Sequence, residues 1–325
     1  MSRRQYAEGN RKALQRIFTE GADLVYYAQR NVLYPPGLLL VDYDLAQLEL
    51  ASTASARCAE LRDLSGPYQS IVFNLPRFVP FWQTEVDVCA ASNILRSSGR
   101  LTMVVPARSG RTRLCRILSS AFGRVERASK RPEVLTCWRP LGRTPEPYAN
   151  EIRYFDPELN QTLSFFTRPG LFSADEIDPG TRLLLDVIEV SGGQRVLDVG
   201  CGYGAIGVVA GARGGEVHLL ECDCRALGMA ERNLKRNRVL GTALLAASLD
   251  RLRDCSFDLV LSNPPTHAGS TLLQSLFRGM VRICRPQGQV VLVVREHLNY
   301  EKWLRCLGEV QVVASRDGFK ILQIA

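Results

Sequence analysis

The sequence has few histidines, no cysteine pair with zinc-binding spacing and no long apolar run. It holds three histidines in 325 residues. Its ten cysteines are scattered, and the one close pair, Cys222 and Cys224, is a C-x-C rather than the C-x-x-C of zinc sites. We therefore expect no metal. No stretch approaches the roughly 20 apolar residues of a membrane span, and no apolar core follows the basic N-terminus. We expect a cytoplasmic protein with no membrane partner.

Acidic residues are scarce in the first half of the chain. Residues 1–140 contain 20 Lys and Arg against 12 Asp and Glu, whereas residues 141–325 contain 21 of each, so the formal charge of +8 comes from the first half. A basic surface suits a polyanionic partner, because neutralising phosphates releases counterions. A solvated basic face has the same composition. We expect nucleic-acid contact here, with Arg108, Arg111 and Arg113 as candidate contacts.

One stretch in the second half has the pattern of a nucleotide-binding turn. Residues 194–207 read QRVLDVGCGYGAIG, an apolar run followed by Gly200, Gly202 and Gly204 and then by small residues that favour a helix. Strand, glycine turn and helix form the entry to a nucleotide-binding βαβ unit, where the backbone must approach its ligand closely. Asp198 precedes the glycines, and it favours a cationic or zwitterionic ligand over a phosphate.

The next two apolar runs also end in polar groups. Residues 217–221 read VHLLE, and a carboxylate such as Glu221 at the tip of the second strand is placed to accept hydrogen bonds from a ribose diol. Residues 257–265 read FDLVLSNPP, which predicts a strand that ends at Asn263, Pro264 and Pro265.

Together these motifs resemble the class I S-adenosylmethionine-dependent methyltransferases, and the Asn-Pro-Pro signature implies that an amino or amide nitrogen is methylated. PGLFSADEIDPGTRLLL (169–185), SNPPTHAG (262–269) and RDGFKIL (316–322) resemble the bacterial 16S rRNA guanine-N2 methyltransferases of the RsmC and RlmG type. The resemblance covers about residues 165–325 and is weak before them. It implies S-adenosylmethionine as cofactor and ribosomal RNA, or a ribosomal subunit, as partner.

The resemblance also implies roles for single residues of the cofactor site. Asp198 and the glycine turn would face the methionine part of the cofactor, and Glu221 would bind its ribose. Ser248 follows the third strand, where the adenine would lie, and Asn263 would also contact the cofactor.

On the substrate side, the Asn263 side chain and the Pro264 carbonyl would accept hydrogen bonds from the target NH₂, on a turn that the two prolines make rigid. His267 matches the family's histidine and is a further candidate catalytic residue.

Thr266 departs from the family, which has an aromatic residue there that stacks on the base. Stacking of this kind is worth about 1–3 kcal/mol per base, so another residue would have to supply it, with Phe172 and Phe155 as candidates. The departure keeps other acceptors open: a protein glutamine, an adenine N6 or a small molecule. A non-catalytic RNA-binding or assembly factor is a third class, which the intact motifs disfavour.

The first half repeats the pattern of the second. SSGRLTMVVP (97–106) matches PQGQVVLVVR (286–295), and Asn74 follows a strand as Asn263 does, but the first half lacks the glycine motif. We expect an α/β fold with two tandem Rossmann-like methyltransferase domains. Residues 1–140 would be a degenerate, basic domain with an RNA-binding or scaffold role, and 141–150 a linker. Residues 151–325 would be the catalytic domain, a doubly wound sheet that binds the cofactor, in a monomer.

Local patterns predict the individual elements. They indicate helices at 23–31 and 45–59, a strand at 38–41 and a helix at 181–190. Residues 151–166 are expected to form a small hairpin or β-extension over the site.

Overall fold

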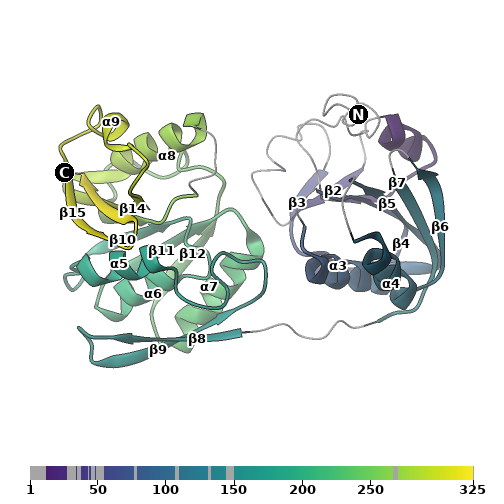
Figure 1. Ribbon diagram of the computed structural model, residues 1–325, viewed down its shortest axis with the longest axis horizontal. Coiled ribbons are helices and arrows are strands. Elements are labelled where there is room, and N and C mark those ends of the chain that lie inside the picture. Colours follow the sequence, from purple (N-terminus) through teal and green to yellow (C-terminus); the bar gives the residue numbers. More distant parts are fainter. Residues whose placement is uncertain are drawn as a thin grey trace. The chain divides into compact units, whose positions relative to one another are not determined.

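The computed structural model describes residues 12–27, 34, 38–42, 44, 48, 55–76, 79–106, 110–130, 133–143, 150–265 and 270–324. The chain forms two compact units, residues 1–147 and 148–325 (Figure 1). Each contains a seven-stranded sheet, so the predicted α/β fold with two Rossmann-like arrangements is confirmed. Within the described residues, no helix is both long and apolar enough to cross a membrane.

The sheet of the second unit has the strand order β12-β11-β10-β13-β14-β16-β15. The first five strands of that order run parallel, and β16 is antiparallel to both of its neighbours. Its strands are β10 (Arg195–Val199), β11 (Glu216–Glu221), β12 (Gly241–Leu245), β13 (Phe257–Ser262), β14 (Cys284–Arg295), β15 (Val310–Arg316) and β16 (Phe319–Ile324).

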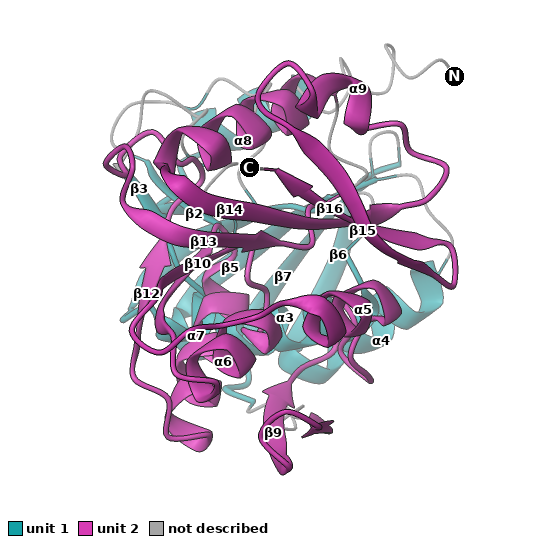
Figure 2. Cartoon of the chain, turned by 90° about the vertical axis from the view of Figure 1, so that its left-hand side faces the viewer, with its two compact units in different colours: residues 1–147 teal, residues 148–325 magenta. Residues whose placement is uncertain are grey.

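Helices cover both faces of this sheet, as Figure 2 shows. One face carries α5 (Pro179–Val187), α6 (Ala205–Ala212) and α7 (Cys224–Arg236), and the other carries α8 (Ser270–Ile283) and α9 (Glu301–Leu304). Successive strand residues point to opposite faces, so Val196 packs in one core and Leu197 in the other. This double burial explains why the central strands are apolar over most of their length.

The first unit repeats the topology with the order β3-β2-β1-β4-β5-β7-β6. Its strands are β1 (Leu24–Tyr26), β2 (Leu39–Asp42), β3 (Ser55–Cys58), β4 (Tyr68–Asn74), β5 (Leu95–Val105), β6 (Phe122–Lys130) and β7 (Glu133–Pro140). Its helices include α3 (Phe81–Ile94), α4 (Arg111–Ala121) and the 3₁₀ turn η1 (Leu61–Asp63).

The two sheets also share their pairing register. Ile71 on β4 lies opposite Leu24 on β1, and Val260 on β13 lies opposite Leu197 on β10. Ile71 and Val260 each precede an asparagine by three residues. The corresponding pairs at the carboxyl ends of the strands are Val25 and Asp198, Tyr27 and Gly200, Asp42 and Glu221, and Asn74 and Asn263.

Two predicted helices of the first unit are wrong over the residues that form strands. The helix predicted at 23–31 is strand β1 over its first residues. The helix predicted at 45–59 contains strand β3 near its end, although Leu48 within it is helical. The rest of both segments lies largely outside the described residues. The strand predicted at 38–41 is confirmed as β2, and the helix predicted at 181–190 is α5, which ends three residues earlier.

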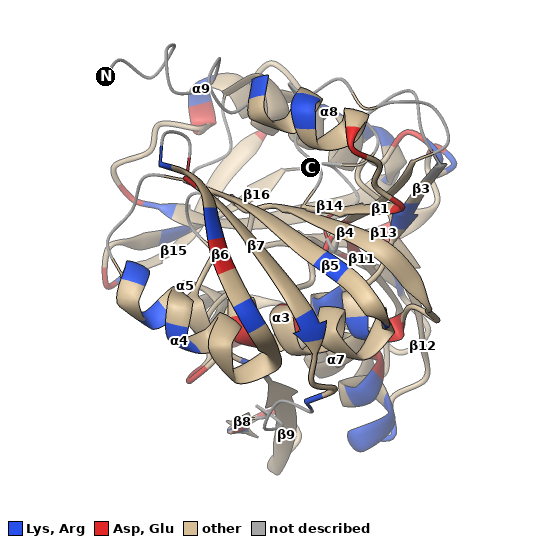
Figure 3. Cartoon of the chain, turned by 90° about the vertical axis from the view of Figure 1, so that its right-hand side faces the viewer, with Lys and Arg blue, Asp and Glu red and all other residues tan. Residues whose placement is uncertain are grey.

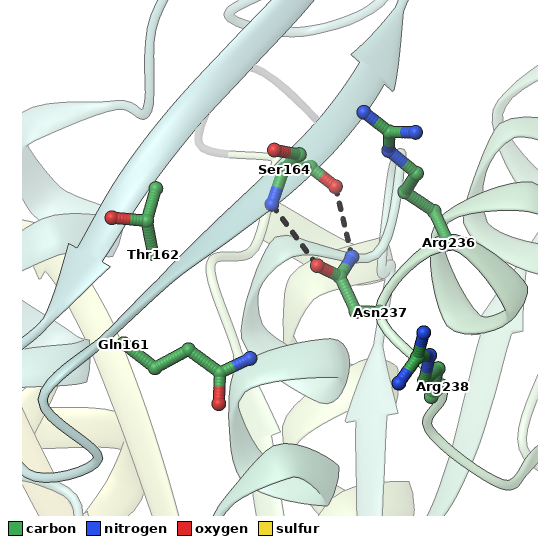
Figure 4. A pocket seen from close by; sticks show the side chains of 6 residues that line it. All are labelled: Gln161, Thr162, Ser164, Arg236, Asn237 and Arg238. Atoms are coloured by element: carbon green, nitrogen blue, oxygen red, sulfur yellow. Dashed lines mark hydrogen bonds between the residues drawn. The ribbon is translucent and has the colours of Figure 1, made fainter.

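The predicted hairpin is confirmed as β8 (Asn150–Asp156) and β9 (Gln161–Thr167), and it is held by Asn233 of α7 and by Asn237, which caps the end of that helix. The Phe166 N–H donates to Asn233 Oδ1 (2.7 Å), and Asn233 Nδ2 donates to the Phe166 carbonyl (2.9 Å). Asn237 makes the same pair of bonds with Ser164, at 3.0 and 2.8 Å (Figure 4). We call these four bonds the asparagine clasp.

Candidate functional site

Three neighbouring strands of the second unit end in the polar residues that the sequence singles out. Asp198 lies on β10, Glu221 ends β11 and Asn263 follows β13. Strands β11, β10 and β13 are adjacent and parallel, so their carboxyl ends meet at one edge of the sheet. In open α/β sheets this edge is where ligands bind.

The glycine turn joins β10 to α6 with the backbone in the left-handed region. The φ angles of Gly200, Gly202 and Gly204 are +69°, +57° and +88°. A Cβ on Gly200 or Gly202 would meet nothing within 4 Å, so these two residues border open space. A Cβ on Gly204 would lie 3.1 Å from the Ala230 side chain, so this glycine lets the start of α6 approach α7. Two glycines therefore suit the approach of a ligand, and the third serves helix packing.

Asp198 is fully buried and only half satisfied. Its Oδ2 accepts a hydrogen bond from the Gly207 N–H (2.8 Å), whereas Oδ1 is buried without a partner among the described residues. Burial raises the pKa of Asp198 to about 7, against the lowering effect of the Gly207 bond and with a further rise from the Glu221 charge. A buried oxygen of this kind suits a ligand that brings a donor or a positive charge.

Glu221 ties the glycine turn to the second strand. Its Oε2 accepts from the Gly202 N–H (2.9 Å), and its Oε1 accepts from the N–H groups of Cys222 (2.7 Å) and Asp223 (3.1 Å). A carboxylate offers about four lone-pair sites, so these three bonds leave room for one further donor. A hydroxyl of a bound ribose is a donor of the right kind.

Asn263 is oriented by the start of α5. Its Nδ2 donates to Asp178 Oδ2 (3.0 Å) and to Thr181 Oγ1 (2.9 Å). Asp178 is also the N-cap of α5, because the same oxygen accepts from the Thr181 N–H (3.0 Å). The sequence predicts only the cap, and the bond to a residue 85 positions away carries no local sequence signal.

Most of the remaining candidate residues of the second unit are more exposed than those at the carboxyl ends of the strands, or lie outside the described residues. Ser248 is exposed after β12, and its Oγ accepts from the Asp250 N–H at 3.4 Å. Phe172 and Phe155 are 64% and 55% exposed, the first between β9 and α5 and the second on β8. Pro264 and Pro265 follow Asn263 directly, while Thr266 and His267 lie outside the described residues.

Among the described basic residues of the first unit, three lie on α4 and three on the edge strand β6 (Figure 3). Arg111 is already paired, because its Nε lies 3.1 Å from Glu133, which Arg127 also approaches at 3.4 Å. The Arg113 guanidinium lies 5.1 Å from the centre of the Phe81 ring and is exposed. Arg108 lies outside the described residues.

A polar hollow of about 300 Å³ lies between the hairpin and the end of α7 (Figure 4). Arg236 on its wall lies 3.0 Å from Glu151 and its guanidinium stands over the Phe166 ring, so it has partners within the hairpin. The residues that line the hollow are Gln161, Thr162, Ser164, Arg236, Asn237 and Arg238. Since none belongs to the glycine turn or the strand ends, the hollow reflects how the hairpin docks.

The family comparison identifies the second unit. Residues 162–323 match the model of the family described as "Methyltransferase small domain". The second unit is a methyltransferase small domain. The motifs at its strand ends, Asp198 with the glycine turn, Glu221 and Asn263, all lie inside the matched range.

Curated relatives match about half of the chain or somewhat more. The ribosomal RNA small subunit methyltransferase C of Chromohalobacter salexigens is 34% identical over 170 residues, which cover 50% of this chain and 51% of that protein. The ribosomal RNA large subunit methyltransferase G of Streptomyces avermitilis is 32% identical over 213 residues, or 62% and 56% of the two chains. The chain thus spans about half the length of the curated relatives it matches, and the resemblance to RsmC and RlmG is confirmed.

One solved structure resembles both units. It is a T. thermophilus 16S rRNA N2 methyltransferase (RsmC) in complex with AdoMet and guanosine. The TM-score is 0.78 at 24% identity, and the match covers 94% of this chain and 88% of that one. The methyltransferase domain and the unit before it therefore have the two-domain fold of that protein.

Proposed function

We propose that this protein transfers a methyl group from S-adenosylmethionine to N2 of a guanine in ribosomal RNA, with the small subunit favoured. The observation that carries the proposal is the fixed amide of Asn263 at the strand-end edge that the glycine turn opens. The family of the domain and the RsmC and RlmG relatives support the choice of reaction and substrate.

The side chains at the strand ends fit this cofactor. Within the part of the chain that the structure describes, Asp198 offers a buried oxygen without a donor. Glu221 keeps a lone-pair site for a ribose hydroxyl, and Gly200 and Gly202 present bare backbone. Ser248 would lie near the adenine. When bound, the cofactor supplies a methyl group on a positively charged sulfur. Methyl transfer from a sulfonium to nitrogen needs no metal ion.

The chain's part in the reaction is to hold the acceptor nitrogen. Asn263 Oδ1 and the Pro264 carbonyl are the acceptors we assign to the two N–H bonds of the target amino group. This arrangement aims the nitrogen lone pair and favours the positive charge that develops on it. The new N–C bond forms as the S–C bond breaks with its electron pair left on sulfur, and the surplus proton leaves the nitrogen for solvent afterwards. No strong base is needed.

The substrate must bring the base out of a helix, because a paired base cannot reach a strand-end site. We propose that Phe172, Thr266 and His267 contact the flipped base. Arg108, Arg111 and Arg113 of the basic first unit would contact the RNA backbone, although Arg111 would have to leave Glu133 to do so. The first unit would thus act in RNA binding or as a scaffold, and the second in catalysis, within a cytoplasmic monomer.

The test follows labelled methyl groups into acceptors. Labelled S-adenosylmethionine is incubated with 30S subunits, 50S subunits, free rRNA and total protein, with Asn263→Ala alongside the wild type. We expect label in one rRNA and its loss in Asn263→Ala, by about 100-fold or more, because one acceptor aimed at developing charge is removed. Nuclease mapping then names the base.

The other outcomes assign the other functions. Label in protein alone points to a glutamine-type acceptor, an alternative that Thr266 in place of the family's aromatic residue keeps relevant. Cofactor binding without label in any fraction points to a different acceptor. Loss of cofactor binding as well points to an RNA-binding factor without catalysis.

A further inference from the structure

We propose that Asp178 and Thr181 are positioning residues that lock the Asn263 side-chain amide in the one orientation that presents its oxygen to the acceptor amino group. The inference rests on the proposed function, since it concerns the same site. It adds two residues of α5 that neither the sequence motif nor the family match assigns a role.

The chemistry of the partners fixes which end of the amide faces α5. An ionised carboxylate is an acceptor only, so the Asn263 group 3.0 Å from Asp178 Oδ2 must be the NH₂. A flipped amide would place the carbonyl oxygen against the carboxylate and lose the bond to Asp178, whereas the Thr181 hydroxyl can accept from the NH₂ or donate to the oxygen. Thr181 Oγ1, at 2.9 Å, is the second acceptor for the same NH₂. Both N–H bonds are therefore directed toward α5, and Oδ1 points away from it.

The start of α5 is itself rigidly placed. Asp178 Oδ2 accepts both from Asn263 and from the Thr181 N–H, so one oxygen caps the helix and holds the amide. Its negative charge at the helix N-terminus is favoured by the helix dipole. Between the two residues, a Cβ on Gly180 would come within 2.6 Å of Phe319 and 2.9 Å of Val293. The first turn of α5 thus packs directly on the sheet, with no room to shift.

The arrangement separates two properties of the enzyme. The cofactor contacts proposed above come from β10, β11 and the glycine turn, whereas Asp178 and Thr181 touch neither Asp198 nor Glu221 through any hydrogen bond within the described residues. Loss of the lock should leave cofactor affinity unchanged and slow methyl transfer, because a free amide spends part of its time flipped. Misplacement of a catalytic group by about 1 Å can cost about 100-fold in rate.

The kinetic test uses substitutions that keep the fold. Asp178→Ser retains an N-cap for α5 but is too short to reach Asn263. Thr181→Val removes one acceptor with little change of shape, and Thr181→Ser restores it. Thr242→Val, on the exposed edge strand β12, is the matched control. We expect kcat to fall about 10- to 100-fold in Asp178→Ser and Thr181→Val, with recovery in Thr181→Ser and wild-type cofactor affinity throughout.

A purely structural role gives a different pattern. Then the melting temperature and cofactor affinity would fall together with kcat, and Thr181→Ser would not recover separately. Either that pattern or unchanged kcat in both variants overturns the proposal.

A second measurement does not depend on turnover. In protein labelled with ¹⁵N-asparagine, the side-chain NH₂ signals of Asn263 are assigned by their absence in Asn263→Ala. We expect slow hydrogen exchange of these protons in the wild type and faster exchange in Asp178→Ser. Equal exchange rates overturn the lock. If the wild type methylates nothing, the proposed function fails, and this experiment still decides whether the amide is held.

Discussion

The two units share one strand order and pairing register, and they differ at the carboxyl end of the central strand, β1 in the first unit and β10 in the second. Tyr27 in the first unit occupies the position of Gly200 in the second, and its φ of +63° is close to the +69° of the glycine. The same hydrogen bond follows, from Tyr27 N–H to the Val41 carbonyl (3.1 Å) and from Gly200 N–H to the Leu220 carbonyl (2.8 Å). The residue at this position therefore keeps its backbone conformation in the first unit although glycine is gone.

The Tyr27 side chain packs against other residues of the first unit. Its ring is buried and lies 4.4 Å from that of Tyr26, and its hydroxyl donates to the buried Asp87 on α3. Asp87 also accepts from Gln83 Nε2 at 2.9 Å. A residue other than glycine in the left-handed region costs about 1–2 kcal/mol, which these internal contacts offset. The first unit thus puts protein contacts where the second leaves open space.

The acidic positions diverge in a different way. Asp198 is replaced by the apolar Val25, but Glu221 is matched by Asp42, which is buried. The Asp44 N–H donates to Asp42 Oδ1 at 3.0 Å, as the N–H two residues after Glu221 donates to that side chain. The acid at the end of the second strand therefore shapes the following turn in both units. This structural role explains why the first unit keeps an acidic residue at this position, Asp42, although it lacks the glycine motif.

The largest expected effect is on cofactor binding, when the tyrosine of the first unit is placed at the matching position of the second. Gly200→Tyr should abolish cofactor binding, because a large side chain then occupies the open side of the turn. The domain should stay folded, since Tyr27 shows that the same backbone accepts a tyrosine, at a cost of about 1–2 kcal/mol. Calorimetric titration and thermal unfolding measure the two effects.

Gly193→Tyr is the matched control. This glycine also has a positive φ (+77°) and open space around its Cβ, but it precedes β10 and lies at the other end of that strand. It should keep cofactor binding. Binding by Gly200→Tyr within tenfold of the control would show that the turn does not face the cofactor.

The next effect is a pH dependence of stability that Asp198 gives the second unit and that Val25, at the same position, cannot give the first. The pKa of Asp198 is raised to about 7, so between about pH 4 and pH 7 the native state binds more protons than the unfolded state. Stability without cofactor should therefore fall as pH rises through this window, by on the order of 4 kcal/mol in total. Asp198→Asn should lose this fall. Urea unfolding of both proteins at pH 5 and pH 8 gives the difference, and parallel pH profiles would contradict it.

The smallest effect concerns the first unit alone. Tyr27→Phe removes a donor from the buried Asp87 and should cost about 1–3 kcal/mol of stability, with no change in cofactor affinity. Tyr154→Phe is the control, because the buried Tyr154 hydroxyl has no partner among the described residues. Chemical denaturation compares the two. A cofactor affinity that changes with Tyr27→Phe would mean that the first unit contributes to the site.

The sequence predicts the second unit better than the first, for physical reasons. Long apolar strands and the glycine motif identify β10, β11 and β13. Strand β1 has only three residues, and the SARC of β3 is hardly apolar, so tertiary pairing rather than local pattern makes them strands. The strand-end residues follow from the rule that parallel strands end together. The contact of Asp178 with Asn263 spans 85 residues, and only the packing of α5 on the sheet reveals it.

The asparagine clasp limits how this protein can change in length. Two residues four apart on a helix are separated by about 6 Å along its axis, and two residues two apart on a strand by about 6.8 Å. That near-match lets Asn233 and Asn237 bind Phe166 and Ser164 as a neighbouring strand would. Insertion of a single residue between either pair would shift one partner out of reach. Length variation among related chains should therefore fall in the β8–β9 turn and spare the clasped segments.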